Sequence, residues 1–329
     1  MRNTPFILLL CVMTAGALSS GCSKSKKAAI PSGNSADSSA ASSTADSPAE
    51  MKIKWEVGKK YSMRMELDQT VKTEVPNQPQ PVIQVVKLTQ DFDISVLKEL
   101  DNGGRQLELT FENQTINVSQ GDHGVLSFDS AQNAAPDAGN PFAPILRAMI
   151  GAPIQYFTDA SGKVEKVEGV DELMNHMAKA GRPQEQAMLK DMFSEDTLRQ
   201  YGSFADAMPD HAVNIGDHWP LKKDIPSSIG VLALDMKYTL KNWEQFADRK
   251  CAHVEAVGDV STKSISTAAG AEVEIKDGKV SGDLWLDPAL GMIVGMNDDQ
   301  NMRLKITTRA QTMTAQFNRK TRLSLVDVR

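Results

Sequence analysis

The stretch "WEVGKKYSMRMELDQTVKT", residues 55–73, decides how the chain folds. From Tyr61 onward apolar and polar residues alternate, so that Met63 and Leu67 share one face while charged residues occupy the other. A period of two is typical of an antiparallel strand with one buried and one solvated face. At about 3.3 Å per residue, a strand over 61–75 is roughly 50 Å long, and a strand of that length must twist and coil. The stretch therefore predicts a curved antiparallel sheet or an open barrel.

Other segments continue the same alternation in both halves of the chain. Apolar residues alternate over 86–96, with Gln90 as an interruption, and again over 107–111, while "DNGG" at 101–104 is a hairpin turn signal between those segments. In the C-terminal half the expected strands cover 232–240, 251–260, 271–276, 280–287, 292–296, 302–308, 311–317 and 322–328. The pair Asp298–Asp299 falls between two of these and is interpreted as a turn.

Two pairs of stretches indicate a repeated unit. "VNIGDHW" (213–219) has the pattern of "WEVGKKY", because in each an apolar residue is followed by Gly, two polar residues and an aromatic residue, and an alternating segment comes next. "YFTDASGKVEKV" (156–167) is matched by "LWLDPALGMIVGM" (284–296), in which an aromatic residue, an Asp two positions later and a Gly-containing turn recur. These correspondences predict an internal duplication, although independent hairpins could also produce them by chance.

The middle of the chain changes to helical spacing. "DELMNHMAKAG" ends in a Gly stop signal, and "PQEQAMLKDMF" begins with a Pro at a helix-start position. A Met-rich helical block is therefore expected over 169–210, between a first antiparallel β region at 51–168 and a second at 211–329. We predict an α+β fold with long antiparallel strands in one or two curved, half-barrel-like sheets and a central helical block.

The N-terminus has the features of an export signal. Arg2 precedes "FILLLCVMTAGAL" (6–18), and these 13 residues are too few to span a bilayer, which needs about 20. Residues 1–21 are therefore expected to be a signal peptide. Most of the segment from 22 to 50 that follows is rich in Ser and Ala, which cannot bury a core, so a disordered tether is expected there.

The sequence at the end of this signal, "LSSGC", resembles a bacterial lipobox. That resemblance implies that Cys22 is diacylated and becomes the mature N-terminus, and that the protein is anchored to a membrane through the acyl chains. Ser23 stands where similar lipoproteins carry the Asp that retains them at the inner membrane, which implies the periplasmic face of an outer membrane. A secreted protein cut by the ordinary signal peptidase is the alternative.

Composition and motifs exclude several functions. The formal charge of −6 argues against a nucleic-acid partner, because phosphate binding needs a basic face. No catalytic motif occurs, so no catalytic residue, cofactor or metal is predicted. His211 and His218, with Asp210 and Asp217, form the one histidine–acid cluster, and a solvated loop is expected there. Cys251 lies in an alternating segment and is expected to be a small core residue.

The methionines suggest one kind of binding site. Methionine adapts to irregular apolar shapes, so a helical block rich in it could cover a curved sheet and enclose a lipid-like ligand. The alternative is that these side chains merely fill the core. The candidate lining residues are Met174, Met177, Met188, Met192 and Phe193.

Three stretches resemble an uncharacterised family of bacterial lipoproteins, a domain of unknown function: "MIGAPIQYFTDASGKVEKVEGVDEL", "MLKDMFSEDTLRQ" and "VNIGDHW". The resemblance implies an exported lipoprotein and supplies no activity. "SGDLWLDPALGMIVGM" (281–296) is more loosely similar to the tight hairpin of periplasmic half-barrel lipoprotein carriers. The sequence thus leaves two hypotheses, a non-enzymatic envelope protein that binds a protein partner or has a structural role, and a carrier or sensor of a hydrophobic ligand.

Overall fold

The computed structural model describes residues 48–76, 78–121, 123–132, 140, 143–180, 195, 198, 199, 202–227, 230–265 and 271–329. Its strands are β1 (Lys60–Glu74), β2 (Val82–Glu99), β3 (Arg105–Gln120), β4 (His123–Asp129), β5 (Pro153–Thr158), β6 (Val164–Glu168), β7 (His218–Ser227), β8 (Gly230–Phe246), β9 (Arg249–Ile265), β10 (Ala271–Asp287), β11 (Met292–Thr308) and β12 (Thr312–Val328). The helices are α1 (Ala143–Met149), α2 (Val170–Ala180) and the 3-10 helix η2 (Phe204–Ala207).

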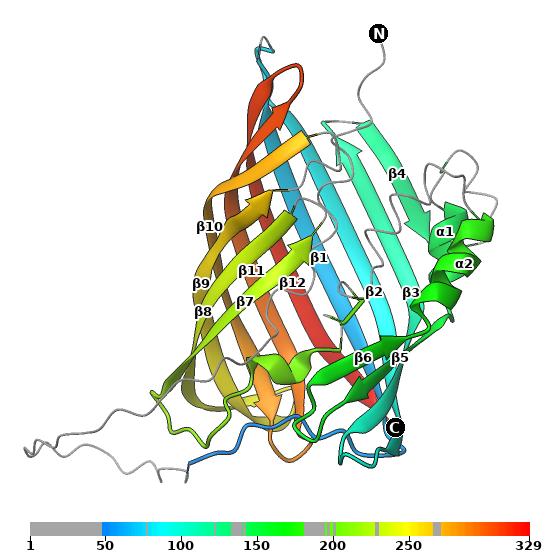
Figure 1. Cartoon of the computed structure of the whole chain (residues 1–329), viewed down its shortest axis with the longest axis vertical. Helices are drawn as coiled ribbons and strands as arrows, with labels where there is room; N and C mark the ends of the chain where they lie inside the picture. The colour runs from blue at the N-terminus through cyan, green and yellow to red at the C-terminus, as the bar shows by residue number, and fades with distance from the viewer. Residues whose placement is uncertain are drawn as a thin grey trace, which may run out of the picture.

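All twelve strands belong to one antiparallel sheet, in the order β6-β5-β3-β2-β1-β12-β11-β10-β9-β8-β7, with β4 paired to β3 (Figure 1). The first and last long strands join the two halves, because β1 pairs with β12 from Tyr61 opposite Val328 to Glu74 opposite Thr314. Residues 51–168 and 211–329 therefore contribute to a single sheet. Of the two predicted alternatives, one sheet or two, the structure has one.

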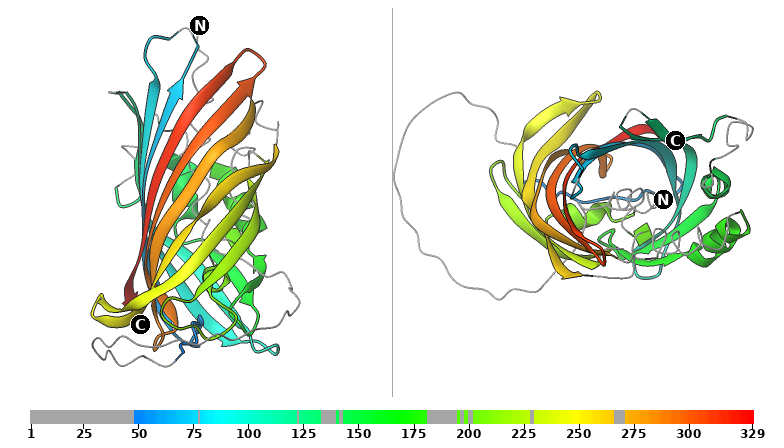
Figure 2. Two further views of the ribbon diagram at one scale, coloured as in Figure 1. Left: turned by 90° about the vertical axis from the view of Figure 1, so that its left-hand side faces the viewer. Right: turned by 90° about the horizontal axis from the view of Figure 1, so that it is seen from above.

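The sheet curls so that one face is concave, as the view from above shows (Figure 2). Strict alternation in the sequence places large apolar side chains on this face; in β1 every second residue from Tyr61 to Thr73 is buried. Strands of 15 to 18 residues twist and coil strongly, which gives the sheet its curvature. The predicted long, curved antiparallel strands are confirmed.

Two sets of five strands share one topology. Each strand of the series β1, β2, β3, β5, β6 lies six positions along the sheet from the corresponding strand of the series β7, β8, β9, β10, β11. Because six is an even number of positions in an antiparallel sheet, corresponding strands run in the same direction. Gly58 and Gly216 both have positive φ in the turn before the first strand of their set. Each donates its N–H to a backbone oxygen in the C-terminal half of the second strand, Val96 O (2.9 Å) and Leu240 O (2.7 Å) respectively.

The irregularities of the two sets also coincide. A β-bulge follows Val96 in the β2–β3 pair and Leu240 in the β8–β9 pair. Another bulge follows Phe157 in the β5–β6 pair and Trp285 in the β10–β11 pair. The two stretches of each pair matched in the sequence thus occupy equivalent places in the sheet.

The central helical block is not confirmed. Of residues 169–210 the structure describes α2, η2 and a few isolated helical positions, so the described fold is mostly antiparallel β with two short α-helices. α1 and α2 pack against each other beside β3 and β5 and do not form a layer across the sheet (Figure 1). The predicted α+β class is corrected accordingly. The predicted positions Met188, Met192 and Phe193, and the signal, Cys22 and most of the tether, lie outside the described residues.

A second correction concerns Asp298 and Asp299. They were expected in a turn between strands at 292–296 and 302–308, but both lie in the middle of the continuous strand β11. Asp298 points to the buried face and Asp299 to the solvated face. Inward and outward side chains continue to alternate through this pair, and the inward position is occupied by a polar residue, Asp298.

The lower end of the sheet is closed by the chain itself. Residues 48–58 run beneath the strands, where Ala49 forms an antiparallel bridge with Val213. Trp55 packs edge-to-face on Tyr61 and on Phe204 of η2, with ring centroids 5.6 Å and 6.0 Å apart. On the other side of the base, Trp219 donates its indole N–H to the backbone oxygen of Ala207 (2.9 Å). η2 is therefore held between the two halves of the sheet.

Candidate functional site

The concave face is apolar over most of its area. The strands β2, β1, β12 and β11 place buried side chains side by side in rows that cross the sheet, because pairing is in register. The residues that make this lining near the middle of the sheet are Met63, Met65, Leu67, Val71, Val86, Leu88, Phe317 and Leu323. An apolar group that lies against such a surface is removed from water, which is favourable by about 25 cal/mol per Å² of apolar area.

A belt of polar side chains crosses this apolar face. Gln69 of β1 lies opposite Arg319 of β12, which lies opposite Gln300 of β11. Two residues along the strands, Thr321 lies opposite Asp298. All five are buried, and we call them the polar belt. Polar groups rarely occupy such positions without hydrogen-bond partners, because burying them unpaired costs free energy.

Several atoms of the polar belt lack partners within the described part of the chain. Both side-chain atoms of the Gln69 amide, the hydroxyl of Thr321 and Oδ1 of Asp298 are buried there without a hydrogen bond. Within the belt, the Gln300 amide donates a hydrogen bond to Asp298 Oδ2 (2.9 Å). The guanidinium of Arg319 lies 5.9 Å from the centre of the Phe317 ring. The belt therefore presents unused donors and acceptors toward the concave side.

Burial raises the pKa of Asp298 to about 6, since the ionised carboxylate loses its hydration; the positive charge of Arg319 and the bond from Gln300 oppose this shift. On β8, burial also raises the pKa of Tyr238 above its ordinary value, and the charge of Asp298 adds to that effect. Asp298 is thus an acid whose protonation changes near neutral pH, inside an apolar surface.

Two further inward glutamines extend polar character onto neighbouring strands. Gln90 of β2 lies opposite Gln114 of β3. Both belong to the row of inward residues that contains Met65, next to the row of Thr321 and Asp298. Both are buried, and Oε1 of Gln114 has no partner among the described residues. The interruption that Gln90 makes in the sequence alternation is therefore a polar position on the buried face.

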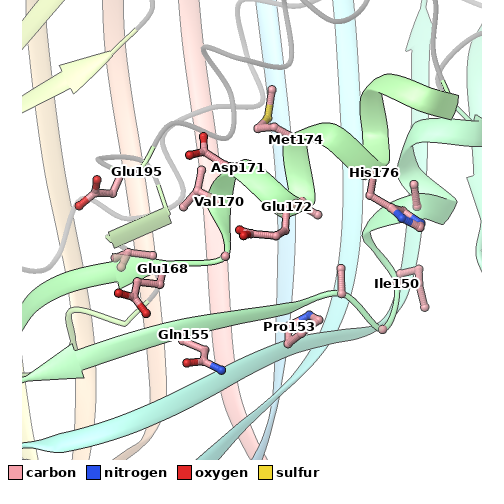
Figure 3. Close-up of a pocket in the computed structure, with 16 residues that line it drawn as sticks. Ile150, Pro153, Gln155, Glu168, Val170, Asp171, Glu172, Met174, His176 and Glu195 are labelled. Atoms are coloured by element: carbon pink, nitrogen blue, oxygen red, sulfur yellow. The ribbon is translucent and has the colours of Figure 1, made fainter.

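A cavity of about 1040 Å³ lies beside α2, between this helix, α1 and the β5–β6 hairpin (Figure 3). Met174 contributes to its lining, together with Val170 and Ile150. Glu168, Asp171, Glu172, His176 and Glu195 supply polar lining (Figure 3). Among the predicted lining residues that the structure describes, Met174 thus lines a cavity, whereas Met177 is fully buried in the core.

A second cavity, of about 1170 Å³, lies at the base. Trp55 and Trp219 line it together with Asp206, which lies 3.9 Å from the Lys223 ammonium. Burial raises the pKa of Asp206, and Lys223 and Lys163 oppose the shift. Charges of both signs surround this cavity, so it shows no preference for one ligand class.

The histidine cluster does not form a metal centre in the described residues. His211 Nδ1 contacts Asp210 Oδ1 at 2.7 Å, and both are exposed. Asp217 accepts hydrogen bonds from the backbone and side chain of Asn214, and so stabilises the turn before β7. No group of three or more metal-ligating side chains was found in the described part of the chain. Cys251 is a buried free thiol, and burial raises its pKa to about 11.

Sequence reasoning missed the polar belt. The available signal was the alternation of side chains along each strand. Gln69 lies on the same face as Met63 and Leu67, and the other members of the belt lie on the same face as the buried apolar residues of their strands: Asp298, Gln300, Arg319 and Thr321.

None of the described helices is long and apolar enough to cross a membrane.

Residues 102–293 match DUF6263, described as a family of unknown function. No curated protein matches the chain. Among solved structures, a structure described as "Lipid-protein interactions in lipovitellin" aligns with a TM-score of 0.48 and 9% identity, covering 84% of this chain and 26% of that one. A DUF1329 family protein from Desulfovibrio piger aligns with a TM-score of 0.13 and 7% identity, covering 82% and 85% of the two chains. The chain therefore spans about a quarter of the lipovitellin chain, and at these scores neither likeness bears on function.

Proposed function

The chain belongs to DUF6263, a family of unknown function, so we propose from its own geometry that it carries a hydrophobic, acyl-chain ligand against the concave face of its sheet. The observation that carries the proposal is the polar belt within the apolar lining. A face built only to fill a core gains nothing from five buried polar side chains, whereas an amphipathic ligand needs both an apolar wall and hydrogen-bonding groups.

The lining fits the chemistry of an acyl chain. Unbranched side chains such as Met63 and Met65 adapt to a flexible hydrocarbon, and the buried rows extend to both sides of the belt along β1 and β12. The cavity beside α2 has a volume at the upper end of what small-ligand sites need. The proposed role is binding, without catalysis.

The proposal includes the location of the protein. Cys22 carries acyl chains, and the Ser/Ala-rich residues behind it connect the folded body to the periplasmic face of an outer membrane. Two or more acyl chains give stable anchoring, because a single chain binds a bilayer only marginally. A hydrophobic ligand would then be exchanged close to the membrane surface.

Native mass spectrometry of the full-length protein, purified from a bacterial host, tests both parts. We expect an added, non-covalent mass that solvent extraction identifies as an acyl lipid, and a covalent acyl mass on the N-terminal peptide that Cys22→Ser abolishes. Leu67→Gln should reduce the non-covalent occupancy about ten-fold, because an amide would be buried against hydrocarbon. Glu66→Gln, which changes the solvated face of the same strand, is the matched control.

A bare protein mass, with no uptake of offered fatty acids or phospholipids, would refute the carrier proposal and favour the role of an envelope protein with a protein partner. An unmodified Cys22 would refute the anchoring. The two readouts are independent, so either part can fail alone.

A further inference from the structure

The polar belt has the geometry of a head-group site. Gln69, Arg319 and Gln300 lie on three adjacent strands in one row, and neighbouring strands are about 4.8 Å apart. Thr321 and Asp298 lie about 7 Å farther along their strands, by the rise of two residues. A group of a few atoms placed over this row therefore reaches side chains from all three strands at once.

Arg319 determines the charge that this site prefers. Its side chain is almost fully buried, so its positive charge lies within the concave face, a position that arginine seldom occupies. The guanidinium is a planar fork of donors that matches the oxygens of a carboxylate or a phosphate, and it remains charged at any ordinary pH. The neighbouring Gln69 amide and Thr321 hydroxyl add neutral donors that have no partner within the described residues.

The protonation state of Asp298 determines whether a nearby negative charge offsets the positive charge of Arg319. Among the described residues, the titratable groups that interact with it are Arg319 from β12, Tyr238 from β8 and Asp299 on its own strand. The positions directly opposite Asp298 on its two neighbouring strands are Gly282 and Thr321, which do not titrate in this range. When Asp298 is protonated, the belt carries a net charge of +1 from Arg319, and its carboxyl becomes a further donor.

We propose that the polar belt binds the oxyanion head group of an acidic acyl ligand, with uptake of a proton by Asp298. This inference rests on the proposed carrier function and names its ligand class. An anion beside Arg319 repels the Asp298 carboxylate, so binding favours the protonated form. By reciprocity, acidification favours binding of the anion.

Calorimetric titration of the full-length protein carrying Cys22→Ser tests the inference. The probes are dodecanesulfonate, whose charge is the same at pH 5 and pH 8, and 1-dodecanol, which has the same chain length and no charge; both are used below their solubility limits. We expect the sulfonate to bind at least ten-fold more tightly than the alcohol at pH 5. Arg319→Gln should weaken sulfonate binding about 10- to 100-fold and change alcohol binding less than about three-fold.

The control for Arg319→Gln is Lys320→Gln, which removes the same charge from the exposed face of the same strand and should leave both affinities unchanged. If Arg319→Gln does not fold by circular dichroism, Gln69→Leu and Thr321→Val replace it, since they preserve the charge of the belt. Each should weaken sulfonate binding about five-fold, with alcohol binding unaffected.

The proton coupling is tested with Asp298→Asn. In the unmodified belt, sulfonate affinity should fall about ten-fold from pH 5 to pH 8, whereas in Asp298→Asn it should remain high at both values. Asp299→Asn, on the solvated face, should retain the pH dependence of the unmodified protein. Comparison of dodecanoate with dodecyl phosphate at pH 8 then shows whether the head group is of the fatty-acid or the phospholipid type.

Equal affinity for dodecanesulfonate and 1-dodecanol would overturn the oxyanion inference and leave the carrier function standing. Sulfonate binding that does not depend on pH, or that depends on it equally in Asp298→Asn, would overturn the role of Asp298. If neither probe binds at either pH, the carrier function itself is wrong.

Discussion

Asp298→Asn is expected to stabilise the folded protein by about 3 kcal/mol at pH 7.5 and to leave its stability unchanged at pH 4. The folded state raises the pKa of this carboxyl from 3.8 to about 6, mainly because burial penalises the charge. Below about pH 4 both states hold the proton, so the cost vanishes. Between about pH 4 and pH 6 the folded state holds the proton more tightly than the unfolded state, so stability falls as the pH rises.

Above about pH 6 the carboxylate is ionised in both states and the cost is constant. Asparagine avoids the cost, because it has the shape of aspartate and can still accept the hydrogen bond from Gln300 without carrying a charge. The measurement is urea denaturation of both proteins at intervals from pH 4 to pH 8. The informative quantity is the difference between the two unfolding free energies, since other titrating groups affect both proteins alike.

Asp299→Asn is the matched control, because this neighbour is partly exposed on the solvated face and lies near Lys320 (3.6 Å). Its replacement should change the stability by less than about 0.5 kcal/mol at any pH in the range. If Asp298→Asn has the same effect at pH 4 and at pH 7.5, or destabilises the protein at pH 7.5, the buried acid is not in the environment described above.

Gly104→Ala is expected to destabilise the fold by about 3 kcal/mol or more. Gly104 ends the "DNGG" turn between β2 and β3, and a Cβ atom there would lie 1.7 Å from the backbone oxygen of Thr158. That contact can be relieved only by moving backbone, because the atom in the way belongs to β5. Thr158 also accepts a hydrogen bond from the Arg105 N–H through its hydroxyl (2.9 Å), so the β3–β5 junction would be displaced.

Thermal and urea unfolding measure this effect, with Gly124→Ala as the control. Gly124 lies in β4, and a Cβ atom there would meet nothing within 4 Å. A methyl group at Gly124 should therefore change stability by less than about 1 kcal/mol. Equal effects of the two substitutions would contradict the close approach of the hairpin turn to β5.

Much of the sheet could be predicted from local pattern. The alternation after Tyr61 fixes both the strand and the face it buries, and "DNGG" fixes one hairpin, because these signals involve neighbours in the sequence. The pairing of β1 with β12 could not be predicted in this way. It joins residues more than 200 positions apart, and nothing in either strand distinguishes an edge from a central position. The choice between one sheet and two therefore required the structure.

The misread Asp298–Asp299 pair and the missed belt have one cause. Period-two reasoning assumes that inward positions are apolar, so an inward Asp298 looks like the end of a strand. The same assumption treated Gln90 as an interruption. Functional sites are where such local rules are expected to fail, since a polar group in a buried position must be compensated by another interaction. Helical spacing, in contrast, correctly places Met177 on the apolar face of its helix, but it does not distinguish a ligand-lining residue from a core residue. In the structure Met177 fills the core.

The central claim is that acyl chains lie against the concave face beside the polar belt, and photo-crosslinking tests it most directly. Full-length protein would be loaded with a fatty acid that carries a diazirine in mid-chain, irradiated and digested, and the modified residues identified by mass spectrometry. We predict adducts on inward residues of β1 and β12, such as Leu67, Val71 and Phe317, and their loss when unlabelled palmitate competes. Adducts confined to solvated-face residues, or unaffected by palmitate, would contradict the account.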